Sequence, residues 1–327
     1  MSVHALQSEA GQRGNRMLRT ALGSSIQAWL DDPQVIEVML NPDGRLWVDR
    51  LGVGIADTGE RLSPADGERI VRLVAHHVGV EVHARRPRVS AELPETGERF
   101  EGLLPPVVAA PAFAIRKPAV AVFTLDDYAA VGIMSRAQAE MLRDAVARRA
   151  NILVVGGTGT GKTTFLNVLL AELAALCPQD RIGILEDTPE LAPCSPDTFR
   201  LRTVEGLDLH RLVKESLRTS PTRLVVGEVR DQAALALLDA WNTGHPGGLA
   251  TLHANGSHEA LVRLSTLIQR AGVPPQPELI VATVSLLVHL VGTSRATRRV
   301  AEIARVTGFN PTTDRFQVQT LYERNDR

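Results

Sequence analysis

The spacing of apolar residues near the N-terminus predicts β-strands followed by a helix. Two apolar runs, residues 35–40 and 45–49, are separated by the sequence Asn-Pro-Asp-Gly at 41–44. Pro, Asp and Gly supply the dihedral angles of a tight turn, so we expect a β-hairpin here. Ser63 and Pro64 then combine an N-cap residue with the residue favoured at the first helical position. Apolar residues that recur on one face after Pro64 indicate an amphipathic helix.

From residue 135 the pattern changes to short apolar runs separated by helical stretches. Ser135 and Gln138 form a capping box that predicts the start of the first of these helices. The apolar runs are residues 151–155, 182–186, 223–227 and 249–253. Strands that alternate with helices are typical of a parallel sheet covered on both faces. The predicted fold class is therefore α/β, with a mainly parallel sheet in this part of the chain.

These patterns predict four segments. Residues 1–21 are rich in Gly, Gln and Arg without periodicity, which is typical of a flexible arm or of a short frayed helix. Residues 22–121 are expected to form a small mixed α/β domain. Residues 122–134 carry Asp and Gly around short apolar pieces, which favours a linker. Residues 135–327 then form the second domain.

Composition narrows the class of protein. The 327 residues include 36 Lys+Arg and 37 Asp+Glu, and no long basic run is present, which disfavours a protein that mainly grips nucleic-acid backbones. Neither Cys177 nor Cys194 has metal-ligand spacing, and reduced thiols are expected. No signal peptide is recognisable. The longest apolar stretch, residues 279–292, is too short to span a membrane and is expected to be buried core. A cytoplasmic protein is predicted.

A phosphate-binding loop follows the apolar run at 151–155. It consists of Gly156, Gly157, Thr158, Gly159, Thr160, Gly161, Lys162 and Thr163, followed by Thr164. In this pattern backbone N–H groups cradle phosphates, the lysine reaches the β- and γ-phosphate oxygens, and the hydroxyl of Thr163 ligates Mg²⁺. The helical sequence that follows would direct its positive end at the phosphates. The expected cofactors are ATP and Mg²⁺.

Two acidic positions are candidates for the catalytic carboxylate. Glu228 follows the apolar run at 223–227 and is expected to orient the attacking water or to hold Mg²⁺ through water. It could instead pair with Arg230. Glu186 and Asp187 end another apolar run, and parallel sheets place ligands at the carboxyl ends of their strands. These two could also serve as a helix cap or a local ion pair, so the choice of the residue that polarises water stays open.

His253 ends the apolar run at 249–253. A histidine at a strand end is usually structural. Here, however, a parallel sheet would place His253 beside the strands that carry Glu228 and the phosphate-binding loop, where an imidazole could sense a γ-phosphate. We therefore include His253 among the expected site residues.

Four motifs in this order resemble those of the secretion-superfamily ATPases. They are the phosphate-binding loop, residues 185–191, residues 226–230, and residues 244–248 through 253–255. In that superfamily they are known as the Walker A motif, the Asp box, the Walker B motif and the His box. The resemblance implies that the second domain is a RecA-like P-loop NTPase domain and that the protein hydrolyses ATP.

Motifs in the N-terminal half are similar to those of the hexameric ATPases of type IV secretion and conjugal transfer. They are residues 86–94, 97–100, 104–107, 113–117 and 124–128. The resemblance implies that the N-terminal domain packs over the nucleotide and that Arg99 and Arg116 reach its phosphates. It also implies a homo-oligomeric ring, expected to be a hexamer, whose N-terminal domains move with the nucleotide state.

The same resemblance implies a protein peripheral to the inner membrane on its cytoplasmic side, bound to secretion-channel proteins. Direct sequence-specific binding of nucleic acid is not expected. Three alternatives remain: a pilus assembly or retraction motor with the same four motifs, a RecA-type helicase, and a nucleotide-dependent scaffold that does not hydrolyse ATP. Only 4% of the residues are aromatic, which disfavours a helicase that stacks bases.

Overall fold

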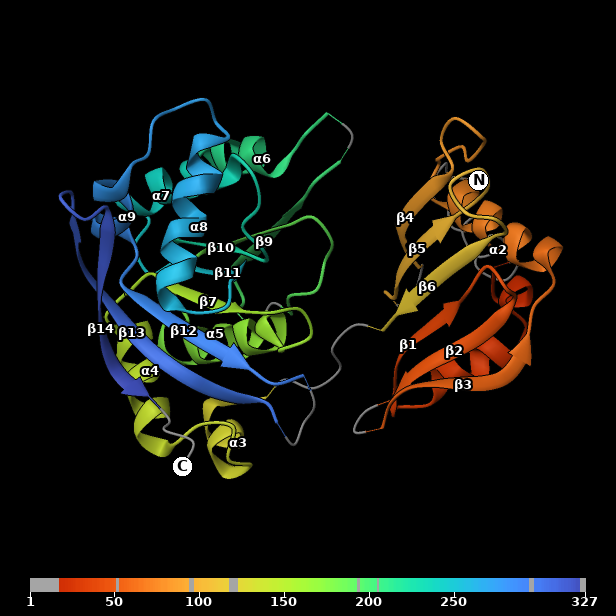
Figure 1. The fold of residues 1–327 in the computed structure, drawn as a ribbon, viewed down its shortest axis with the longest axis horizontal. Coiled ribbons are helices and arrows are strands. Elements are labelled where there is room, and N and C mark those ends of the chain that lie inside the picture. Colours follow the sequence, from red (N-terminus) through yellow and green to blue (C-terminus); the bar gives the residue numbers. More distant parts are fainter. Residues whose placement is uncertain are drawn as a thin grey trace, which may run out of the picture. The chain divides into compact units, whose positions relative to one another are not determined.

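The computed structural model describes residues 18–50, 53–93, 97–117, 123–192, 195–204, 206–293 and 297–323. The chain divides into two compact units, Met1–Val120 and Ala121–Arg327 (Figure 1). The fold class is the predicted one: an antiparallel-sheet α/β unit comes first, and a unit with a mainly parallel sheet follows.

An arm is predicted over residues 1–21. Residues 1–17 of this segment lie outside the described residues. From residue 18 the chain is helical, and this helix runs over residues 18–31. Leu18 and Ala21 are buried in the core of the first unit. These residues are ordered because the helix contributes an apolar face, so an arm extending to residue 21 is wrong for its last four positions.

The first unit is built on a six-stranded antiparallel sheet in the order β3-β2-β1-β6-β5-β4. Its strands are β1 (Val35–Leu40), β2 (Arg45–Arg50), β3 (Gly54–Arg61), β4 (Arg88–Glu92), β5 (Arg99–Leu103) and β6 (Ala112–Arg116). The predicted hairpin is confirmed, because β1 and β2 are antiparallel with Leu40 opposite Leu46.

Helix α2 (Pro64–His77) closes the core of this unit. The Ser63 side chain accepts a hydrogen bond from the Asp66 N–H at 3.2 Å, which caps the helix as predicted. Ile70, Val71 and Val74 are buried on the face that packs against β4 and β6.

The second unit contains an eight-stranded sheet in the order β14-β13-β12-β7-β11-β10-β8-β9. All neighbours from β12 to β9 are parallel, while β13 and β14 are antiparallel additions at one edge. The strands are β7 (Ile152–Gly156), β8 (Ile182–Glu186), β9 (Thr198–Arg202), β10 (Arg223–Val226), β11 (Leu249–His253), β12 (Leu286–Val291), β13 (Arg299–Asn310) and β14 (Arg315–Glu323).

Helices cover both faces of this sheet, as the alternating pattern predicted. One core cluster contains α3 (Leu125–Ala130), α4 (Arg136–Ala147) and α5 (Lys162–Leu176). The opposite cluster contains α6 (Leu209–Ser216), α7 (Ala233–Asn242), α8 (Ser257–Gln269) and α9 (Pro277–Thr283). The apolar stretch at 279–292 supplies the end of α9 and all of β12 and is largely buried. In the part of the chain that the structure describes, no helix is both long and apolar enough to cross a membrane.

The segment predicted as a linker, residues 122–134, contains helix α3. Thr124 and Asp127 form a capping box at its start. Leu125 and Tyr128 are 0% and 3% exposed, and the Tyr128 ring lies 5.4 Å from that of Phe165 in α5. Because these side chains fill the core of the second unit, α3 is part of that unit and the linker prediction is wrong for it.

Candidate active site

The phosphate-binding loop connects β7 to α5 and requires glycine at several positions. Gly159 and Gly161 have φ angles of 76° and 87°, in the left-handed region that favours glycine. A Cβ at Gly156 would lie 2.6 Å from the Leu290 carbonyl oxygen. Thr160 Oγ1 donates to the Gly157 carbonyl at 2.9 Å. The loop is therefore a tightly folded turn that ends at the N-terminus of α5.

Lys162 is the first residue of α5 and is 7% exposed. Its Nζ donates to the carbonyl of Gly157 at 2.8 Å and to Nδ1 of His253 at 3.3 Å. Burial lowers the pKa of Lys162, while the charge of Glu228 opposes this shift. The ammonium is thus held at the mouth of the loop, with the loop itself as one of its acceptors.

His253 lies beside the loop because β11 pairs with β7, and its register partner is Gly156. Its Nε2 lies 3.4 Å from Glu228 Oε1. Burial and the charge of Lys162 lower the pKa of His253, which outweighs the opposite effect of Glu228. Because Nδ1 faces an ammonium donor, we assign the proton of the neutral ring to Nε2, which then donates toward Glu228.

Glu228 follows β10 and forms a charged pair with Arg230, with 2.5 Å between Oε2 and the guanidinium. Burial raises the pKa of Glu228, but Arg230 and Lys162 outweigh it, so the net pKa is lowered and the carboxylate is charged. Arg230 also lies 3.5 Å from Asp187. The sequence left two alternatives for Glu228, a site residue or an ion-pair partner of Arg230. In the structure Glu228 pairs with Arg230 and also lies next to His253 beside the loop.

These side chains form one continuous polar chain along the carboxyl ends of β7, β11, β10 and β8. It runs Lys162, His253, Glu228, Arg230, Asp187. Ligands of open α/β sheets bind at this edge. The arrangement holds a cation, a neutral imidazole and a carboxylate next to a phosphate-binding loop, a combination suited to phosphoryl transfer to water.

Comparison with known families decides between the classes of P-loop protein. Residues 69–320 match the family described as type II/IV secretion system protein. The chain belongs to this family.

Similar proteins indicate which branch of the family the chain resembles. Probable conjugal transfer protein TrbB of Sinorhizobium fredii is 46% identical over 315 residues, covering 95% of this chain and 96% of that protein. Conjugal transfer protein TrbB of Rhizobium radiobacter is 45% identical, covering 90% of each. The solved structure of the pilus retraction motor PilT with bound ADP has a TM-score of 0.58 at 18% identity, covering 92% of this chain and 82% of that one, a likeness of fold alone. The chain is a type IV secretion ATPase, and a pilus motor is less well supported.

Glu186 of this secretion ATPase is held by its own loop. It is 4% exposed, and its Oε1 accepts from the N–H groups of Glu190 and Leu191 at 2.7 and 2.8 Å. Its Oε2 accepts from Arg200 of β9 at 3.1 Å. Burial raises the pKa of Glu186 although these hydrogen bonds act in the opposite direction. The geometry therefore favours Glu228 as the carboxylate that acts on water, and a supporting role for Glu186.

Glu186→Ala should mainly lower stability. It would leave the buried N–H of Leu191 without its acceptor, at a cost of about 1–3 kcal/mol, while the half-buried N–H of Glu190 and the partly exposed guanidinium of Arg200 could turn to water. Chemical denaturation should show a lower unfolding midpoint. Unchanged stability combined with lost hydrolysis would assign the water-polarising role to Glu186 instead.

The His box of the secretion ATPase serves two separate places. Whereas His253 ends β11 beside the loop, Gly247 and Gly248 precede β11 at the opposite end of the strand, and both donate their N–H groups to Asn151 Oδ1, at 2.8 and 2.9 Å. A Cβ at Gly248 would lie 1.9 Å from Trp241 Nε1. The glycines thus fasten the start of β11 to the start of β7, and only His253 joins the site.

Arg99 and Arg116 lie in the first unit of the secretion ATPase. They are direct partners across the antiparallel pair β5 and β6, so their side chains share one face of that sheet. Arg99 pairs with Glu101 at 3.3 Å, and Arg116 is exposed. The predicted contact of Arg99 and Arg116 with the nucleotide phosphates stays a prediction.

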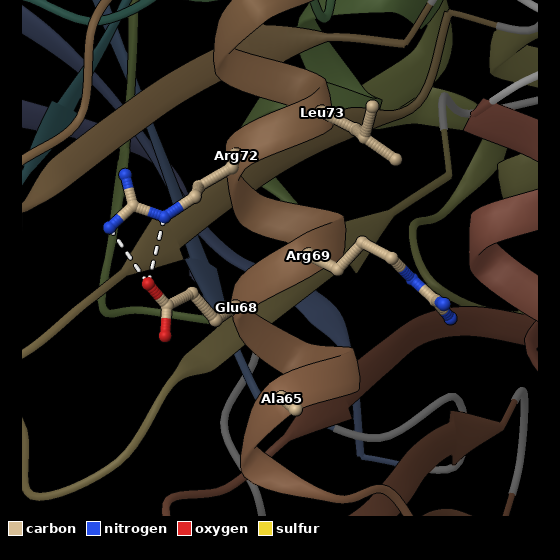
Figure 2. Close-up of a pocket in the computed structure, with 5 residues that line it drawn as sticks. All are labelled: Ala65, Glu68, Arg69, Arg72 and Leu73. Atoms are coloured by element: carbon tan, nitrogen blue, oxygen red, sulfur yellow. Dashed lines mark hydrogen bonds and ion pairs between the residues drawn. The ribbon is translucent and has the colours of Figure 1, made fainter.

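A hollow on α2, shown in Figure 2, contains none of the expected site residues. It is lined by Ala65, Glu68, Arg69, Arg72 and Leu73. Its central charges already neutralise each other, because Glu68 and Arg72 pair one turn apart at 2.7 Å. This hollow offers no arrangement for phosphoryl chemistry.

Proposed function

We propose that this secretion ATPase hydrolyses ATP at the phosphate-binding loop and that the hydrolysis powers conjugal transfer. The observation that supports the site most strongly is the polar chain from Lys162 through His253 to Glu228. The link to conjugal transfer is inferred from the two TrbB relatives, which match nearly the whole chain.

In this proposal the loop N–H groups from Gly157 to Thr164 and the positive end of α5 hold the phosphates. Lys162 exchanges the Gly157 carbonyl and His253 for β- and γ-phosphate oxygens. Residue positioning and charge stabilisation then provide most of the rate enhancement, since no covalent intermediate is needed.

The donor atoms at the loop suit Mg²⁺. The Thr163 hydroxyl and, through water, the Glu228 carboxylate offer the oxygen ligands that this ion prefers. Within the described ranges no group of three or more His, Cys, Asp or Glu could hold a metal ion. The ion would therefore depend on phosphate oxygens for its remaining ligands, as in other P-loop sites. Bound there, Mg²⁺ would neutralise charge that develops on the phosphates.

Glu228 is the residue proposed to orient and polarise the attacking water. Its lowered pKa keeps it charged near neutral pH. His253 bridges Glu228 to Lys162, so it couples the position of the lysine to that of the carboxylate. When Lys162 turns to a γ-phosphate, His253 loses that partner and can respond to the phosphate itself.

The larger assembly is proposed from the resemblance to hexameric type IV secretion ATPases. Six copies would form a ring on the cytoplasmic side of the inner membrane and bind secretion-channel proteins, without reading nucleic-acid sequence. Arg99 and Arg116 would reach the nucleotide from the first unit, and loss of the γ-phosphate would release that unit. A guanidinium suits this task because it binds two phosphate oxygens at once and stays charged.

Arg99→Ala and Arg116→Ala should each lower turnover at least about tenfold, equivalent to about 1.4 kcal/mol of barrier. Steady-state phosphate release measures this. Arg88→Ala is the matched control, because Arg88 is an exposed arginine of the same sheet that pairs with the same Glu101. Loss of turnover in all three variants would point to damage of the sheet instead of a phosphate contact.

The function as a whole is tested in a donor strain that lacks the gene. The wild-type chain should restore plasmid transfer, and Lys162→Ala should not. Restored transfer with the Lys162 variant would contradict an ATP-driven role. A change in pilus retraction with transfer intact would favour the pilus motor.

A further inference from the structure

Arg298 lies against the phosphate-binding loop, outside all four motifs. It immediately precedes β13, and its Nη2 donates to the carbonyl of Gly159 at 3.3 Å. A Cβ built on Gly161 would lie 2.9 Å from both the Cζ and the Nε of Arg298. The guanidinium therefore rests directly on the last glycine before α5.

This position is electrostatically unfavourable without an anion. Gly161 is the N-cap of α5, and the N-terminal end of a helix carries a partial positive charge that repels cations. In addition, Nε of Arg298 is buried and has no hydrogen-bond partner among the described residues. A buried donor that lacks a partner also costs free energy. A phosphate at the loop would relieve both features at once.

The sheet order indicates which end of a nucleotide faces Arg298. On one side of β7, β11 and β10 carry His253 and Glu228. On the other side, β12 and β13 bring Arg298 to the same edge, since Leu290 pairs with Gly156 and Arg299 with Val291. A triphosphate whose γ-phosphate meets His253 and Glu228 thus extends its other end toward Arg298.

We propose that Arg298 is a second cation of the loop and that it binds the nucleotide at the phosphate nearest the nucleoside. The proposal rests on nucleotide binding at the phosphate-binding loop, as proposed above. Arg298 would bind the part common to ATP and ADP, whereas Lys162, His253 and Glu228 face the γ-phosphate. The competing explanation is structural: Arg298 only ties down the loop through the Gly159 carbonyl.

Nucleotide affinity of the full-length protein separates these explanations. Calorimetric titration with ATP and with ADP is carried out on the wild type and on Arg298→Ala, Arg298→Lys and Arg298→Gln. Gln keeps a polar amide at the position of the Arg Nε but carries no charge, so it tests the contribution of the positive charge. Arg299→Ala is the matched control, because Arg299 is the neighbouring arginine at the first position of β13 and donates to the Thr297 carbonyl.

The expected result is a loss of about tenfold or more in affinity for both ATP and ADP with Arg298→Ala and Arg298→Gln, which equals about 1.4 kcal/mol. Arg298→Lys should recover part of it, and Arg299→Ala should bind as the wild type does. KM should rise while kcat changes little, because the contact persists from ground state to transition state.

Three outcomes would overturn the inference. Wild-type binding by Arg298→Gln would show that the positive charge does not contribute to affinity, and wild-type binding by Arg298→Ala would show that the side chain does not contribute at all. A loss for ATP without a loss for ADP would place Arg298 at the γ-phosphate. Lys162→Ala serves as the reference: if it binds nucleotide normally, the proposed function of the loop fails, whereas if it loses binding and Arg298→Ala does not, only the present inference fails.

Discussion

Lys162→Ala is expected to lower the rate of ATP hydrolysis at least about 100-fold. The change removes the only lysine of the loop, whose Nζ is poised between the Gly157 carbonyl and His253. A charge-assisted contact contributes about 1.5–3 kcal/mol in the ground state, and donors aimed at charge that develops in the transition state are worth about 10²–10³ in kcat. Phosphate release at saturating ATP measures the effect.

The fold should survive this substitution. Burial already disfavours the charged form of Lys162, as its lowered pKa indicates, so removing the ammonium gives up little stability. Circular dichroism and thermal unfolding should match the wild type. Lys214→Ala, at an exposed position in the last turn of α6, is the matched control and should hydrolyse ATP normally. A folded Lys162 variant with wild-type turnover would remove the basis for the loop's role.

Glu228→Gln should bind ATP without hydrolysing it. The amide keeps the shape of the side chain but not the negative charge that orients water, so we expect turnover to fall at least about 100-fold. Affinity for ATP should be kept or increased, because one negative charge near the phosphates is lost. Single-turnover measurements with labelled ATP would show bound, uncleaved nucleotide.

A matched control for this change is Glu215→Gln, which neutralises an exposed glutamate paired with Arg218 on the surface. It should hydrolyse ATP at the wild-type rate. Normal hydrolysis by Glu228→Gln together with its loss in Glu186→Gln would reverse the assignment of the two carboxylates.

The parts of the fold that could be predicted from sequence are those with local signals. Pro-Asp-Gly between two apolar runs predicted the β1–β2 hairpin, and Ser63-Pro64 predicted the start of α2. Glycine spacing and Lys162 predicted the loop between β7 and α5, because few other sequences form such a turn. The juxtaposition of His253 with Gly156 was also predictable, since parallel strands align their carboxyl ends.

Other features depend on contacts that the sequence does not display. Helix α3 has six residues, too few for a periodic pattern, and its polar cap at Thr124 and Asp127 looks like a loop until Leu125 and Tyr128 are seen in the core. Arg298 reaches the loop only because β13 returns antiparallel beside β12. The pattern of charged residues along the chain does not predict the antiparallel pairing of β13 with β12.

Arg223 illustrates the same limit inside the core. It is fully buried, yet an arginine at the start of a strand is expected at the surface. Its guanidinium donates to Asp180 at 2.6 Å and to the Val146 carbonyl at 3.0 Å, which offsets the cost of burying the charge. Asp180 and Val146 are far from Arg223 in the sequence, so these contacts cannot be predicted from one sequence alone.

The central place of β7 has a consequence for synthesis of the protein. The two strands that flank it, β11 and β12, begin at Leu249 and Leu286, long after β7 has left the ribosome. Until then the apolar strand that carries the loop has neither of its lateral hydrogen-bonding partners. Pairings of such long range form slowly and expose hydrophobic surface meanwhile. We therefore expect the strand beneath the phosphate-binding loop to gain its sheet partners late in folding, after residues 249–291 have been synthesised.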